Sequence, residues 1–111
     1  MRDHKIYTCI LSYVKTEFGE FDWEALFDKS CKKHEIATCQ QAMRCDSAAQ
    51  AAASDWVHLV LATQNAPYSW EKHWSVAIEV DVYDQDECKH FGTYSCSFTG
   101  SIDSHRRPYK V

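Results

Sequence analysis

A strict alternation of apolar and polar side chains runs from Trp74 to Tyr83, and it constrains the fold more than any other segment. One set of alternate positions is apolar throughout, and the set between them is small or acidic: Trp74, Val76, Ile78, Val80 and Val82 against Ser75, Ala77, Glu79 and Asp81. Neighbouring side chains of a strand point to opposite faces, so this pattern predicts a half-buried strand. One face of its sheet is expected to pack on a core, and the other to meet water with an acidic surface.

Two further strands are predicted. Lys5–Val14 is rich in β-branched and aromatic residues, with Tyr7, Cys9, Leu11 and Tyr13 on one face and Ile6, Ile10 and Val14 on the other. A strand that is apolar on both faces is typical of the middle of a sheet. Lys15–Phe21 and Asp84–His90 are predicted turns, and His90–Ile102 is a last strand around Tyr94, Cys96 and Phe98.

Helical signals occupy the middle of the chain. Asp22 is a predicted N-cap for a helix that ends near Glu35, with an apolar stripe at helical spacing: Trp23, Leu26, Phe27, Cys31 and His34. Thr38 and Gln41 have capping-box spacing, which predicts a second helix through the alanine-rich segment to Ala53. Trp56–Thr63 fits either a continuation of that helix or a strand, and its β-rich composition favours the strand.

The order of strand, two helices and a run of strands predicts an α+β fold: a mainly antiparallel sheet of about four strands with two helices packed on one face. A chain of 111 residues is ordinary for one domain. We expect residues 1–102 to form that domain and 103–111 to be a loose basic tail. The expected core contains Cys9, Trp23, Leu26, Phe27, Val76, Ile78 and Val80.

The six cysteines are expected to be reduced thiols of a cytoplasmic protein. The opening residues contain no long apolar run and no small-residue cleavage site, so they do not resemble a secretory signal. The only asparagine, Asn65, lies outside any glycosylation sequon. Disulfides stay an alternative if a signal peptide was removed ahead of this sequence.

Two close Cys/His pairs raise the question of a zinc site or a thiol enzyme: Cys31 with His34, and Cys88 with His90. Their spacing matches no zinc-finger signature, no C-x-x-C occurs, and three glycines leave no phosphate-binding loop. We expect no metal, no cofactor and no enzyme activity. A small zinc- or thiol-dependent enzyme built on these four residues is the alternative.

Acidic residues gather in two segments that contain no Lys or Arg. The first, residues 17–28, holds five acids including Glu17 and Glu20, and the second holds Glu79, Asp81, Asp84, Asp86 and Glu87. Such patches can meet the basic groove of a partner protein. Two other interpretations are a hard-cation site at Asp81, Asp84 and Asp86, and a solvated face that keeps the protein soluble.

Trp70 and Trp74 lie close together, and an exposed aromatic pair there would anchor an interface; the alternative is that Trp74 belongs to the core. We expect a non-enzymatic binding module for a protein with a basic surface. The net charge of −4 argues against direct contact with nucleic acid, and a composition of 45% hydrophobic and 25% charged residues argues against a membrane span. In size and charge alone the chain is similar to small acidic inhibitors of nucleic-acid-handling complexes, such as phage-encoded anti-restriction and anti-CRISPR proteins.

Overall fold

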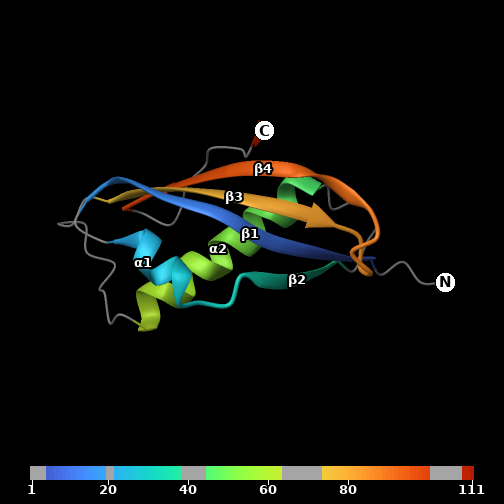
Figure 1. Cartoon of the computed structure of the whole chain (residues 1–111), viewed down its shortest axis with the longest axis horizontal. Coiled ribbons are helices and arrows are strands. Elements are labelled where there is room, and N and C mark those ends of the chain that lie inside the picture. The colour runs from blue at the N-terminus through green and yellow to red at the C-terminus, as the bar shows by residue number, and fades with distance from the viewer. Residues whose placement is uncertain (1–4, 20–21, 39–44, 64–73, 101–108) are drawn as a thin grey trace.

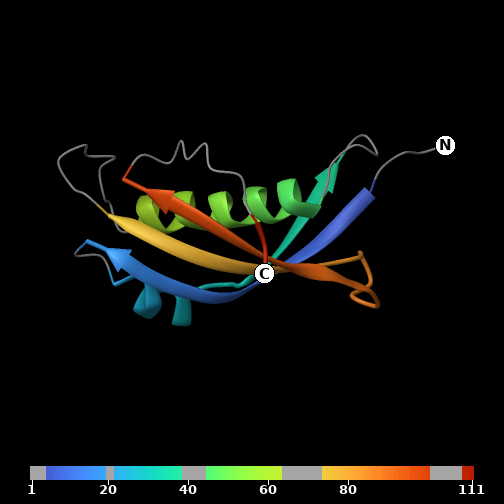
Figure 2. The same ribbon diagram turned by 90° about the horizontal axis from the view of Figure 1, so that it is seen from above.

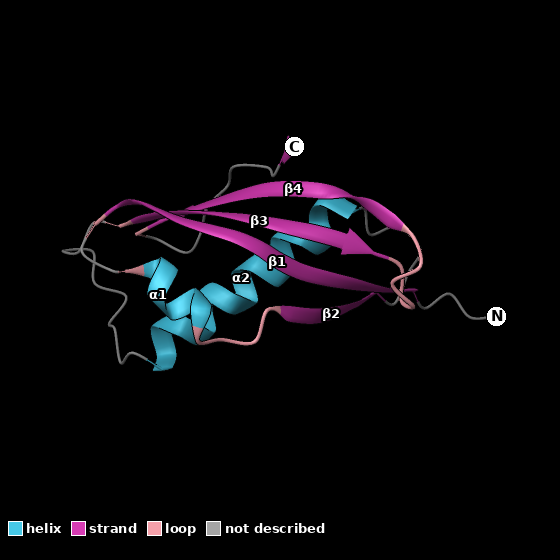
Figure 3. Cartoon of the chain, in the orientation of Figure 1, coloured by secondary structure: helices cyan, strands magenta, loops and turns pink. Residues whose placement is uncertain are grey.

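The strands of the protein form one antiparallel sheet in the order β2-β1-β3-β4-β5, as a computed structural model of the chain shows (Figure 1). The structure describes residues 5–19, 22–38, 45–63, 74–100 and 109–111. The elements are β1 (Lys5–Phe18), α1 (Trp23–Asp28), β2 (Lys33–Thr38), α2 (Cys45–Thr63), β3 (Ser75–Tyr83), β4 (His90–Thr99) and β5 (Tyr109–Lys110). The predicted α+β class is confirmed (Figure 3).

The core lies between the sheet and α2, which crosses one face of it (Figure 2). β3 lies between β1 and β4, and its alternation is as predicted: Val76, Ile78, Val80 and Val82 are fully buried, while the residues between them are partly exposed. β4 contributes Cys96 and Phe98 to the same core. Among the described residues, the hydrophobic core therefore packs on one face of β3, as the sequence of this segment predicts.

β1 is a central strand, as predicted, and it is longer and less regular than expected. It pairs with β2 on one side and β3 on the other, and it continues to Phe18 through the segment predicted as a turn. Two register shifts against β3 leave Ser12 and Glu17 as extra residues. Each extra residue reverses the alternation. Val14 is consequently buried and Tyr13 exposed, which is the opposite of the regular pattern.

The predicted helix 22–35 is wrong beyond Asp28. Its start is correct, because the Asp22 carboxylate accepts a hydrogen bond from the Ala25 N–H at 3.1 Å. The chain then forms β2, which pairs with the first half of β1. His34 and Ile36 alternate with exposed Lys33 and Glu35, so this segment satisfies the backbone groups along the edge of β1 instead of extending a helix.

The predicted strand 56–63 is also wrong, because α2 runs unbroken from Cys45 to Thr63. Trp56, Val57, Val60 and Leu61 are all buried, and this i, i+1, i+4, i+5 spacing is helical. Four fully buried alanines upstream, Ala48, Ala49, Ala52 and Ala53, let the helix lie close to the sheet. Thr38 belongs to β2 and is not a helix cap, and residues 39–44 lie outside the described residues.

Three tryptophans join α1, α2 and the sheet. The Trp23 ring lies 5.7 Å from the Trp56 ring and 5.1 Å from the Trp74 ring, measured between centroids. The Trp56 indole N–H donates to the Ser30 hydroxyl at 2.8 Å, just beyond α1. Five of the seven expected core residues are fully buried, whereas Leu26 and Phe27 pack against the core while partly exposed.

The end of the chain adds a short edge strand. Lys110 pairs with Tyr94 of β4, and the Val111 N–H donates to the Thr93 carbonyl at 2.8 Å. Gly92 has φ +150, a backbone conformation that residues with a side chain rarely adopt, so glycine is favoured at this position. Of the tail expected to be loose, the last residues are thus paired, and residues 103–108 lie outside the described part.

Candidate protein-binding site

The face of the sheet opposite α2 is called the outer face here, and no described helix covers it (Figure 2). Strand register and alternation place on it residues from the three long strands: Tyr13, Lys15 and Phe18 of β1; Ser75, Ala77, Glu79 and Asp81 of β3; Thr93, Ser95, Ser97 and Thr99 of β4. The face is thus rich in hydroxyl groups and carboxylates and carries two aromatic rings.

Residues of both predicted acidic segments meet at this face. Glu17 Oε1 accepts a hydrogen bond from the Ser75 hydroxyl at 3.2 Å, which holds Glu17 beside β3. Glu79 and Asp81 follow along the same strand. The antiparallel pairing of β1 with β3 therefore brings together carboxylates more than sixty positions apart in the sequence. Glu20 lies outside the described residues.

Asp81 is tied into the sheet. Its carboxylate accepts hydrogen bonds from the Thr93 hydroxyl and, at 3.3 Å, from His90 Nε2. The His90 ring also lies 4.9 Å from the Tyr83 ring between centroids. Asp81 therefore connects β3 to β4 as well as contributing negative charge.

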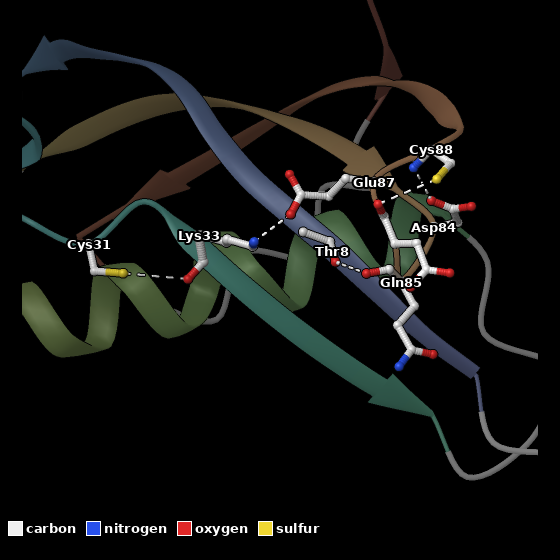
Figure 4. Close-up of polar contacts among 8 residues, drawn as sticks. Thr8, Cys31, Lys33, Asp84, Gln85, Glu87 and Cys88 are labelled. Atoms are coloured by element: carbon white, nitrogen blue, oxygen red, sulfur yellow. Dashed lines mark hydrogen bonds and ion pairs between the residues drawn. The ribbon is translucent and has the colours of Figure 1, made fainter.

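The hairpin tip, residues 84–89, folds across β1 towards β2 (Figure 4). Glu87 forms an ion pair with Lys33 at the start of β2, and the Thr8 hydroxyl donates to the Gln85 carbonyl at 3.3 Å. Thr8 is completely buried by this arrangement. Asp86 is exposed, and no hydrogen bond or ion pair engages its carboxylate in the described part of the chain.

Asp84 has a structural role in this tip. Its carboxylate accepts hydrogen bonds from the backbone N–H groups of Cys88 at 2.7 Å and Lys89 at 3.1 Å. These bonds close the turn around Glu87, whose φ of 59 is unusual for a residue with a side chain. The Asp84 carboxylate is thus occupied by backbone N–H groups of the tip, whereas the Asp86 carboxylate is exposed to solvent.

Asp84→Ala should destabilise the protein by about 1–2 kcal/mol, because two backbone N–H groups lose a charged acceptor. Asp86→Ala is the matched control, and it should change the free energy of unfolding by less than about 0.5 kcal/mol. Urea unfolding followed by tryptophan fluorescence measures both. Equal stability of the two variants would show that the Asp84 bonds do not hold the tip.

The remaining predicted site residues are not brought together. Trp74 is 4% exposed, so it belongs to the core and not to an interface, and Trp70 lies outside the described residues. Figure 4 shows Cys31 and Cys88 well apart, each thiol donating to a nearby backbone carbonyl, of Lys33 and Asp86 respectively. Cys31 and His34 do not share a helix face. The described residues contain no group of three metal-ligating side chains.

The five described cysteines are free, and two of them are deeply buried. Burial raises the pKa of Cys9 and of Cys96 to about 12 each. Cys9 Sγ also donates to the Ala48 carbonyl at 3.7 Å. These two thiols are therefore protonated at neutral pH and are poor nucleophiles.

Two exposed aromatic residues of the outer face were missed by the sequence analysis. Tyr13 is 50% exposed and Phe18 is 59% exposed, whereas the regular alternation placed Tyr13 with the core residues and Phe18 in a turn. The extra residues Ser12 and Glu17 bring both rings to the outer face. The run Lys15-Thr16-Glu17, polar within a β-rich segment, was the available signal of an irregular strand.

No family model matches the chain, and no curated protein or solved structure is similar enough to match it. Among the described residues, no helix is long and apolar enough to cross a membrane.

Proposed function

We propose that this protein is a non-enzymatic binding module whose outer face and hairpin tip engage the basic surface of a partner protein. One observation carries the proposal. A sheet face that no described helix covers holds Glu17, Glu79 and Asp81 from two distant acidic segments, beside the exposed rings of Tyr13 and Phe18. Exposed aromatic rings supply contact area at interfaces, and carboxylates supply charge complementarity to Lys and Arg.

The charge of the face favours a protein over a nucleic acid as the partner. Nucleic acid would need several ordered Lys or Arg on one surface, whereas Lys15 is the only basic residue among the described ones that the register of β1, β3 and β4 places on the outer face. A protein groove that binds phosphates presents the opposite charge and suits these carboxylates. The partner class that we propose is therefore a nucleic-acid-binding protein, and the effect is inhibition by occupation of its groove.

The proposal is tested by capturing a partner from extracts of the source cells and measuring its dissociation constant against salt. The affinity should fall at least about tenfold from 0.1 to 1 M salt, since the screening length drops from about 10 Å to about 3 Å. Asp86→Lys should weaken binding mainly by slowing association, because Asp86 is exposed. A dissociation constant that is unchanged both by salt and by Asp86→Lys would contradict the proposal.

A further inference from the structure

We infer that Tyr13 and Glu79 form a receptor for an arginine side chain of the partner protein, an inference that rests on the proposed function. The two residues face each other across β1 and β3, and Ser95 of β4 continues the same row. Directly opposed side chains on one sheet face lie within contact distance of each other. The row therefore presents a carboxylate beside an aromatic ring, and its third member, Ser95, is buried where β4 pairs with β5.

Among the described residues, no side chain or backbone group donates to the Glu79 carboxylate, unlike the other carboxylates of the outer face. Glu17 accepts from Ser75, and Asp81 accepts from Thr93 and His90. In the described part of the chain, Glu79 takes part in a side-chain hydrogen bond only through its backbone carbonyl, which accepts from the Ser12 hydroxyl at 3.3 Å. A partly buried carboxylate without a donor gains more from an incoming cation than one already hydrogen-bonded.

Tyr13 supplies the second half of the receptor. Its ring is half exposed, and the neighbouring Val14 points to the opposite face and is buried. The extra residue Ser12 shifts the alternation along β1, and this shift places Tyr13 on the outer face. Arginine suits this pair better than lysine, since its planar guanidinium stacks on a ring while donating two parallel hydrogen bonds to a carboxylate. Lys15 shares the outer face, two residues along β1 from Tyr13 and opposite Ala77 of β3.

The test uses ¹⁵N-labelled protein and three short acetylated, amidated peptides with the sequence Gly-Ser-X-Ser-Gly, in which X is arginine, lysine or citrulline. The arginine peptide should shift the amide signals of Tyr13, Glu79 and Ser95 in a saturable way. Citrulline keeps the shape of arginine without its charge, and it should bind at least about tenfold more weakly. Lysine should bind about threefold more weakly.

Three variants separate the parts of the receptor. Glu79→Gln should weaken the arginine peptide at least about tenfold, and Tyr13→Leu about threefold, whereas Tyr13→Phe keeps the ring and should retain binding. Absence of a saturable shift at this row, equal binding of citrulline, or a stronger shift with a single-stranded oligonucleotide would overturn the inference. A captured partner that responds to salt and Asp86→Lys but not to Glu79→Gln or Tyr13→Leu would overturn the arginine receptor alone and leave the proposed function standing.

Discussion

Trp56→Ala should lower the free energy of unfolding by about 3–5 kcal/mol. The side chain is completely buried in α2, and its ring contacts Trp23 and Phe27. Its indole N–H also donates to the Ser30 hydroxyl, which in turn donates to the Phe27 carbonyl at the end of α1. Alanine would leave a cavity and remove the contacts by which Trp56 holds α1 against α2.

Leu59→Ala is the matched control, three residues further along the same helix. Leu59 is 51% exposed, so its truncation should cost less than about 0.5 kcal/mol in urea unfolding. If residues 56–63 formed a strand with Val57, Leu59 and Leu61 on one buried face, Leu59→Ala would instead be costly. A large loss for Leu59→Ala with a small one for Trp56→Ala would therefore contradict the helix.

The cysteines should differ by orders of magnitude in their reaction with iodoacetamide under native conditions. A thiol whose pKa is about 12, as for Cys9 and Cys96, is ionised at pH 8 to only about one part in ten thousand, and both side chains are inaccessible. Cys31 and Cys88 are exposed and should be alkylated first. Peptide mass spectrometry of timed samples measures the order.

The same burial gives a dependence of stability on pH. The pKa values of Cys9 and Cys96 are raised on folding from their ordinary value of 9.0, so the stability that they contribute is complete below pH 9 and is lost as pH rises towards 12.

The alkylation experiment also has a contradicting outcome. Rapid labelling of Cys9 and Cys96 in folded protein at pH 8, with Cys31 and Cys88 unreacted, would contradict the packing of β1 and β4 beneath α2.

The sequence predicts those parts of the fold whose pattern is regular and local. The alternation at Val76–Val82 specifies β3 because one face is buried along its whole length. The sequence pattern fails to identify an element where the same residues fit both the helical and the strand period, because contacts with the rest of the fold then decide between them. His34 and Ile36 fit a helical stripe as well as a strand, and the unpaired edge of β1 selects the strand. Trp56–Thr63 is β-rich, and burial of four side chains at helical spacing selects the helix.

The candidate site was predicted in charge but not in geometry. The sequence identifies Glu17, Glu79 and Asp81 as acidic, whereas only the pairing of β1 with β3 shows that they share a face. It cannot separate Asp84, which holds two backbone N–H groups, from Asp86, which holds none in the described part of the chain. The exposure of Tyr13 depends on the extra residue Ser12, and such bulges have no simple sequence signature.

The central claim, that the outer face binds the partner, is tested most directly by two substitutions with the same change of charge on opposite sides of the protein. Glu79→Lys lies on the outer face, and Asp55→Lys lies at an exposed position of α2. Dissociation constants for the captured partner should rise at least about tenfold for Glu79→Lys and less than about twofold for Asp55→Lys, with both variants folded. Equal weakening by the two substitutions, or weakening by Asp55→Lys alone, would contradict the assignment of the outer face as the binding surface.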